Sequence, residues 1–172
     1  MQASNPDFEK LCDDSDSTLS DAMETVFLMN TEDAYMIWRH ISIPLSYKYD
    51  LSYMIDDILN LIEQLQKEMC GTKYISWLPD TFRSDWKVEW KNGKLIIYAE
   101  WYNITGGLEK ILNKDNCLQM NIDDFLKEWK KILETIYYSL KQCNYTENQI
   151  YNMKRLFFQL NNIQEYGTLY TK

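Results

Sequence analysis

The stretch WKVEWKNGKLIIYAEW, residues 86–101, decides the fold of this chain. It contains two runs of alternating apolar and polar residues, and Asn92 and Gly93 separate the runs. An Asn-Gly pair is favoured at the centre of a type I′ turn because both central positions need a positive φ angle. The stretch therefore predicts a two-stranded antiparallel hairpin in which Trp90 faces Leu95.

This register gives the hairpin two chemically different faces. One face is apolar and is predicted to join the core: Trp86, Val88, Trp90, Leu95, Ile97, Ala99 and Trp101. The other face carries Lys87, Glu89, Lys91, Lys94, Ile96, Tyr98 and Glu100. A slip by one residue would expose the tryptophans, so the register is strongly specified. Two alternatives stay open for the second face: a helix covers it, or it is an exposed surface suited to a protein interface.

Apolar residues spaced three or four apart predict helices on either side of the hairpin. We expect Asp50 to cap the helix that follows it and Gly71 to end that helix in the left-handed conformation. Thr146 and Gln149 have the spacing of a capping box at the start of the last helix. The predicted helices are a short one from residue 19 and longer ones at 51–69, 122–141 and 147–164.

These elements predict a fold of the α+β class, with a small antiparallel sheet centred on the Trp-rich hairpin and packed against three or four helices. The length of 172 residues suits a single domain, which we place at residues 19–172. Residues 1–18 are polar and are predicted to be a flexible acidic lead-in. Residues 31–47 fit either a helix that Thr31 caps or a strand, and their β-branched and aromatic side chains favour an extended segment at 36–43.

The charge of the chain is unevenly distributed. Residues 1–33 contain nine acids and one base, so this segment carries the whole formal net charge of −8. The rest of the chain is balanced and contains no basic field that could neutralise phosphates. Nucleic acid and anionic membranes are therefore not expected as partners. A basic protein partner is electrostatically favourable, although an acidic terminus can also serve solubility alone.

The sequence contains no pattern typical of a metal or cofactor site. The four cysteines are widely spaced, form no CxxC pair, and are expected to be free thiols: Cys12, Cys70, Cys117 and Cys143. One histidine, His40, cannot complete a zinc site with them. No run of about 18 apolar residues and no signal-peptide pattern is present, so we expect no membrane contact and a cytoplasmic location.

Catalytic motifs are also absent from the sequence, including GxSxG, HExxH, Walker A and GxGxxG patterns. His40 is expected to be a partly buried core or edge residue rather than a catalyst. A carboxylate-based enzyme remains an alternative, because Glu89, Glu100 and Asp80 could meet in the folded chain. The expectation is a protein without catalytic activity.

Several segments together resemble the small immunity proteins of bacterial polymorphic and contact-dependent growth inhibition toxin systems. The resemblance rests on WKVEW at 86–90, Asn92 with Gly93, AEW at 99–101 and FLKEW at 125–129. It implies a cytoplasmic, non-catalytic protein that binds and neutralises a cognate toxin domain, often a basic nuclease. Charge complementarity with such a toxin would raise the association rate.

Two groups of residues are candidates for contact with a protein partner. The first consists of acids near the N-terminus, and the second lies on the outer face of the hairpin. The candidates are Asp13, Asp14, Asp16, Glu89, Tyr98 and Glu100. A non-catalytic adaptor or regulatory domain that binds a different protein is the alternative function.

Overall fold

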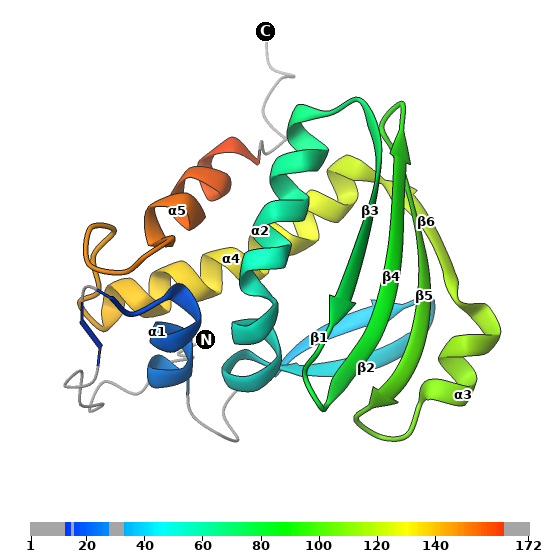
Figure 1. Cartoon of the computed structure of the whole chain (residues 1–172), viewed down its shortest axis with the longest axis horizontal. Helices are drawn as coiled ribbons and strands as arrows, with labels where there is room; N and C mark the ends of the chain where they lie inside the picture. The colour runs from blue at the N-terminus through cyan, green and yellow to red at the C-terminus, as the bar shows by residue number, and fades with distance from the viewer. Residues whose placement is uncertain (1–12, 15, 28–32, 164–172) are drawn as a thin grey trace, which may run out of the picture.

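The computed structural model describes residues 13–14, 16–27 and 33–163 and shows an α+β fold (Figure 1). Five α-helices accompany two antiparallel sheets in the described part of the chain. The helices are α1 (Leu19–Val26), α2 (Ser52–Lys67), α3 (Glu109–Leu112), α4 (Ile122–Gln142) and α5 (Met153–Asn162). The strands are β1 (Asp33–Trp38), β2 (Ile41–Ser46), β3 (Cys70–Trp77), β4 (Phe82–Lys91), β5 (Lys94–Ile104) and β6 (Cys117–Asn121).

The larger sheet has the strand order β3-β4-β5-β6 with all neighbours antiparallel. Its centre is the predicted hairpin, in which Trp90 faces Leu95 and Asn92 and Gly93 form the turn with φ angles of 51° and 75°. All seven residues of the predicted core face are buried. The predicted hairpin and its register are confirmed.

The extended structure expected at 36–43 is also present, but it is a second hairpin formed by β1 and β2. Its turn is at Arg39 and His40, and Arg39 takes a φ angle of 57°. His40 is exposed at this turn, so the expectation of a partly buried histidine is wrong. Apolar residues of both strands, such as Trp38 and Ile43, are buried, and Trp38 packs on tryptophans of the larger sheet.

A cluster of aromatic side chains joins the second hairpin to the inner face of the larger sheet. Trp38 of β1 meets Trp101 of β5 edge to face, with ring centroids 5.0 Å apart. Trp86 contacts Trp77 in the same way at 5.4 Å, and Phe82 contacts Trp101 at 5.6 Å. Edge-to-face packing brings the positive edge of one ring to the negative face of the next. The core is therefore centred between the two sheets and the helices.

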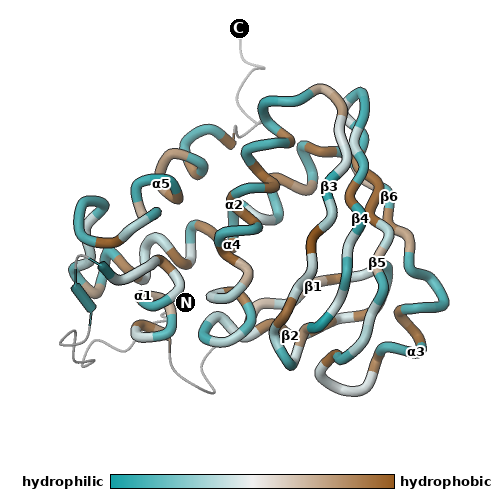
Figure 2. Tube along the Cα trace, viewed as in Figure 1, coloured by the Kyte–Doolittle hydropathy of each residue, from teal (hydrophilic) through white to brown (hydrophobic). Residues whose placement is uncertain are grey.

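The helices α2 and α4 cover the inner face of the larger sheet, and α1 and α5 pack on their far side (Figure 1). Along α2 and α4, apolar residues recur every three or four positions, with polar residues between them (Figure 2). The expectation that the three long helices pack on the sheet is right for α2 and α4, whereas α5 packs mainly against these two helices. The contact to α2 includes the Nε of Arg155, which donates to Glu63 at 2.6 Å.

Two predicted ends of the second helix are wrong. Asp50 does not cap it: a π-helical turn at Tyr47–Leu51 precedes α2, Ser46 caps this turn, and the Asp50 side chain is buried. Gly71 does not end α2 but lies within β3, directly opposite Trp90. The helix ends at Lys67, four residues earlier than Gly71. Both errors arise because residues distant in sequence, rather than the local helix, determine these positions.

The last helix also begins later than predicted. Residues after Thr146 form turns, and α5 starts at Met153 with Asn152 in the left-handed conformation at a φ angle of 69°. The capping-box spacing instead produces a turn in which the N–H of Gln149 donates to the carbonyl of Thr146 at 3.0 Å. The predicted end at residue 164 lies outside the described residues. Cys70, Cys117 and Cys143 form no disulfide with one another, and Cys12 lies outside the described residues.

Candidate protein-binding surface

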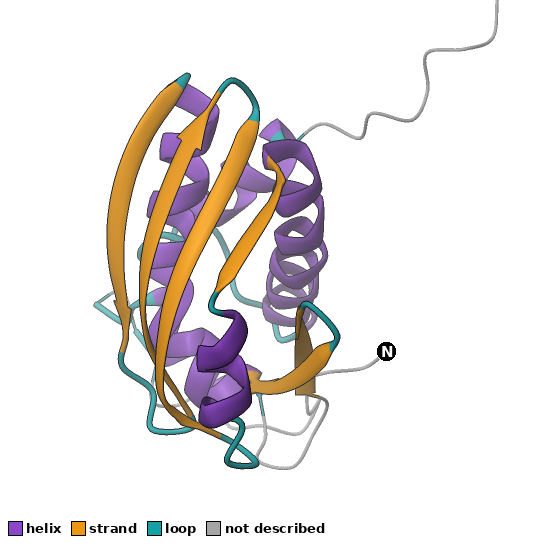
Figure 3. Cartoon of the chain, turned by 90° about the vertical axis from the view of Figure 1, so that its right-hand side faces the viewer, coloured by secondary structure: helices purple, strands orange, loops and turns teal. Residues whose placement is uncertain are grey.

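The outer face of the larger sheet is open. In the part of the chain that the structure describes, no helix lies over this face (Figure 3). Three tyrosines on its strands are strongly exposed, with Tyr74 at 73%, Tyr102 at 48% and Tyr98 at 40%. Ile96 is half-buried among them. The alternative in which a helix covers this face is therefore wrong for the described residues.

The register of the strands places Tyr74, Lys87 and Tyr98 side by side in one row across the sheet. The ammonium of Lys87 lies 5.8 Å from the ring centroid of Tyr98 and 2.7 Å from the carboxylate of Glu89. The hydrogen bond to Glu89 raises the pKa of Lys87, so this lysine stays charged. The row places a lysine between two aromatic rings, and tyrosine is a residue type enriched at the centre of protein interfaces.

Charges of opposite sign occupy the two ends of this face. Asp85 and Glu100 are directly opposite each other at one end. Lys91 and Lys94 are directly opposite each other at the other end, next to the hairpin turn. Like charges that face each other across a strand pair destabilise a sheet. Keeping two such pairs costs stability, and it gives the open face an acidic end and a basic end.

A tyrosine completes the acidic end. The hydroxyl of Tyr102 donates to Asp85 at 3.0 Å, and this bond, with further help from Glu100, raises the pKa of Tyr102 to about 12. The hydroxyl therefore remains protonated and holds one carboxylate in place. The hairpin register predicted from the sequence already implied the pairing of Asp85 with Glu100. Asp85 was not among the predicted contact residues, because it lies just before the alternating stretch at 86–101 that defines the predicted hairpin.

The structure brings three of the predicted contact residues onto one surface. Glu89, Tyr98 and Glu100 all lie on the open face. Glu89 is occupied by its ion pair with Lys87, whereas Tyr98 and Glu100 are exposed. The surface is larger than predicted, because β3 adds Tyr74 and further residues to it.

The other predicted contact residues lie elsewhere. Asp13 accepts a hydrogen bond from the hydroxyl of Tyr145, which follows the end of α4. Asp14 and Asp16 belong to the same turn, in which the N–H of Asp16 donates to Asp14 at 2.9 Å. The start of α4 meets the hairpin turn at Gly93, whereas Tyr145 follows the other end of this helix, which is about 30 Å long at 1.5 Å per residue. The two groups do not form one site.

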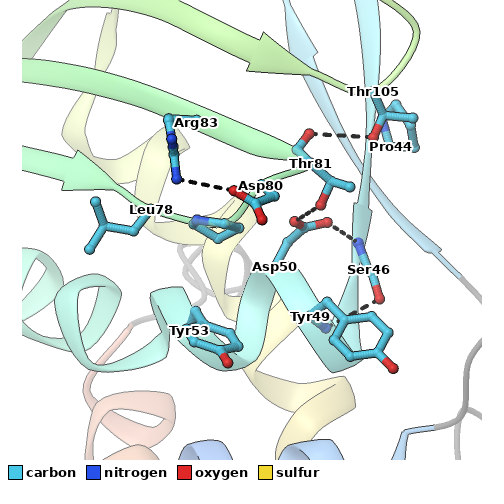
Figure 4. A pocket seen from close by; sticks show the side chains of 11 residues that line it. Pro44, Ser46, Tyr49, Asp50, Tyr53, Leu78, Asp80, Thr81, Arg83 and Thr105 are labelled. Atoms are coloured by element: carbon cyan, nitrogen blue, oxygen red, sulfur yellow. Dashed lines mark hydrogen bonds and ion pairs between the residues drawn. The ribbon is translucent and has the colours of Figure 1, made fainter.

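A hollow of about 690 Å³ lies at the junction of β2, α2 and the loop between β3 and β4 (Figure 4). The buried carboxylate of Asp50 borders it and accepts hydrogen bonds from the hydroxyl of Thr81 and from the N–H of Ser46 at 2.7 Å. The carbonyl of Thr81 in turn accepts the N–H of Thr105 at 3.0 Å. These bonds tie three loops together, so the role of Asp50 that the structure supports is structural.

The carboxylates considered for catalysis do not gather at one point. Asp80 lies in the β3–β4 loop and pairs with Arg83 at 3.0 Å. Glu89 and Glu100 are on neighbouring strands but four positions out of register, or about 13 Å along the sheet. Across residues 13–163, outside the two gaps, no group of three or more His, Cys, Asp or Glu side chains is placed to hold a metal ion.

In the same residues, no helix has both the length and the apolar character needed to cross a membrane. Comparison of the chain with protein-family models, with curated proteins and with solved structures gave no match.

Proposed function

We propose that this chain is an immunity protein that binds a bacterial toxin domain through the open face of its larger sheet and occludes it. The observation that carries the proposal is this face, on which exposed tyrosines lie between an acidic end and a basic end. Tyrosine gives a large contact area at low conformational cost and is common among residues that dominate binding energy. The resemblance of the WKVEW and FLKEW segments to immunity proteins supports the same function.

The charge distribution supports a cationic toxin as the partner. The formal net charge of −8 attracts a basic protein over long distances, and the acidic end of the face gives that attraction a direction. In this arrangement Asp85 and Glu100 face basic residues of the toxin. The tyrosine row is buried on binding and provides most of the affinity, because exposed charges contribute more to the association rate than to stability.

The test is co-expression with the protein encoded directly next to the gene of this chain. We expect the chain to protect the host cell from that protein and to bind it when purified. Replacing Tyr98 with alanine is expected to weaken binding by about 10- to 100-fold, the range of a central aromatic contact. Tyr138→Ala is the matched control, because Tyr138 is also strongly exposed but lies on α4.

Failure of the chain to protect the cell would exclude the immunity function. Equal binding by the Tyr98 and Tyr138 variants would exclude the open face as the contact surface. Adding about 100–200 mM salt should slow association, since screening shortens the reach of the charges. An unchanged association rate would show that the charge distribution plays no part.

The alternative function is that of an adaptor or regulatory domain, which the same open face also supports. In that case the chain binds a protein that is not toxic to the host when expressed alone. The co-expression experiment separates the two functions, because only an immunity protein restores growth.

A further inference from the structure

The strand β3 forms a free edge of the larger sheet. It pairs with β4 along its whole length without a register shift, and no second strand among the described residues pairs with it. Figure 3 shows no described element beyond this edge. Proteins usually protect such an edge with proline, a bulge or a very short strand. β3 has eight residues and none of these three features, and the protective feature that it does carry is an inward charge, Lys73.

The hydrogen-bond pattern shows which backbone groups this edge presents. The N–H of Asn92 donates to the carbonyl of Met69 at 3.3 Å, so these two residues form a hydrogen-bonded pair. Because such pairs alternate along an antiparallel ladder, every second residue after Met69 is directed toward β4. The N–H and carbonyl groups of the residues between them are directed away from the sheet. These outward residues are Cys70, Thr72, Tyr74 and Ser76.

Apolar side chains stand at both ends of the edge. Met69 precedes β3 with 84% of its surface exposed, and Leu78 follows β3 with 68% exposed. Leu78 lines the hollow at the β3–β4 loop together with Tyr53 of α2, which is 64% exposed. An extended backbone paired with β3 would therefore find apolar contacts for its own side chains at either end.

One charged residue determines what can pair with this edge. Lys73 projects toward the inner side of the sheet, and in the described part of the chain its ammonium has no carboxylate partner. An inward charge near a free edge opposes pairing between two copies. Pairing of β3 with itself around its centre brings Lys73 opposite or next to its counterpart, and both copies carry a net charge of −8. A strand from another protein with an acid opposite Lys73 avoids both the contact between two lysines and the repulsion between two chains of net charge −8.

We infer that the β3 edge accepts an extended segment of a partner protein as a fifth strand, with a carboxylate of that segment opposite Lys73. The outward backbone groups of Thr72, Tyr74 and Ser76 hydrogen-bond to the added strand, which is a common mode of peptide recognition. The inference is independent of the toxin: it concerns the edge of the sheet, whereas the proposed function uses its open face.

The test uses a library of random dodecapeptides displayed on phage and selected on the purified chain. We expect enriched peptides to share an acidic residue at a fixed position among alternating apolar residues. Bound peptide should slow amide exchange of Thr72, Tyr74 and Ser76. The variant Ser76→Pro removes one outward N–H without touching the ladder to β4, so it should weaken binding by about 10-fold.

Two further variants separate edge pairing from simple loss of structure. Ser76→Ala keeps the N–H and is expected to bind like the natural chain. Lys73→Glu should reverse the selected charge, so that its enriched peptides carry a base where those of the natural chain carry an acid. This gain of a new preference cannot come from unfolding.

Three results would overturn the inference. The first is a selection that enriches no peptide sensitive to Ser76→Pro. The second is a Lys73→Glu variant that selects the same peptides as the natural chain. The third is a dimer of the natural chain in sedimentation that Ser76→Pro dissociates, because the edge then serves a second copy of this chain.

Discussion

Gly71 provides the sharpest test of how the larger sheet is built, through the substitution Gly71→Ala. This glycine is directly opposite Trp90, and the indole of Trp90 lies against its backbone. A Cβ atom on Gly71 would lie 2.3 Å from Cζ2 of Trp90 and 2.8 Å from two further ring atoms. Such distances are far below van der Waals contact, so the indole must move. An aromatic ring that covers a glycine across strands is a recognised way to stabilise an edge strand.

The expected cost follows from what the indole loses. Overpacking in a core costs about 1–3 kcal/mol. Displacing Trp90 also breaks the bond from its Nε1–H to the carbonyl of Glu68 at 3.0 Å, which is worth about 1 kcal/mol. Alanine lowers the conformational entropy of the unfolded chain relative to glycine, and this offsets about 0.4–1 kcal/mol of the cost. We therefore expect Gly71→Ala to lower the free energy of unfolding by about 2 kcal/mol.

The measurement is equilibrium unfolding in urea, followed by tryptophan fluorescence. With a slope of about 2 kcal/mol per molar urea, the midpoint should fall by about 1 M. The same substitution in a Trp90→Leu background should cost less than about 0.5 kcal/mol, because the clash is gone. Thr72→Ala, at the exposed neighbouring position, should change the midpoint little.

A cost that is the same in both backgrounds would refute this reasoning. A glycine needed only for a left-handed helix end would behave that way, with a penalty of about 1 kcal/mol whatever residue stands opposite. The double-mutant cycle therefore distinguishes the contact with Trp90 from the helix-end role expected from the sequence.

Three further predictions concern side chains outside the hairpin turn. Asp50→Ala should lower the free energy of unfolding by about 3 kcal/mol in urea, since it removes two hydrogen bonds to a buried carboxylate, from the hydroxyl of Thr81 and the N–H of Ser46. Asp80→Ala, at the rim of the same hollow, should change it by less than about 0.5 kcal/mol. Asp85→Asn should lower the pKa of Tyr102 from about 12 toward 10, as measured by carbon-13 NMR. In the natural chain the bond from the Tyr102 hydroxyl to Asp85 stabilises the fold fully below pH 10, and this contribution is lost as the pH rises through 12. The hydrogen bond from Arg155 lowers the pKa of Glu63, so this carboxylate adds to the free energy of unfolding above its ordinary pKa and ceases to do so as the pH falls through the lowered one. Glu63→Gln should remove this pH-dependent contribution, as measured by unfolding in urea at several pH values.

The hairpin at the centre of the chain was predictable to the residue. The turn at Asn92 and Gly93 and the alternation around it are local properties, and a shift by one position would expose every tryptophan. The helices α2 and α4 were predictable within a few residues for the same reason, because their apolar spacing repeats over several turns. Periodic burial therefore determined the type of most elements.

The helix ends were less predictable because they depend on partners far along the chain. Asp50 has the residue type of a helix cap, but Thr81 lies thirty-one positions away and provides the hydroxyl that binds its carboxylate. Thr146 and Gln149 have the spacing of a capping box but form an isolated turn before α5. In each case the residues have the types found at a helix cap, but they form other hydrogen bonds in the folded chain.

The candidate surface shows the same division. The sequence by itself determined that Glu89, Tyr98 and Glu100 share one face of the hairpin, since side chains alternate along a strand. Only the tertiary structure decided that no described helix covers this face, that β3 extends it with Tyr74, and that Asp13 lies beside Tyr145, after the end of α4. The physical reason is that alternation acts over a few residues, whereas the covering of a face depends on where distant segments pack.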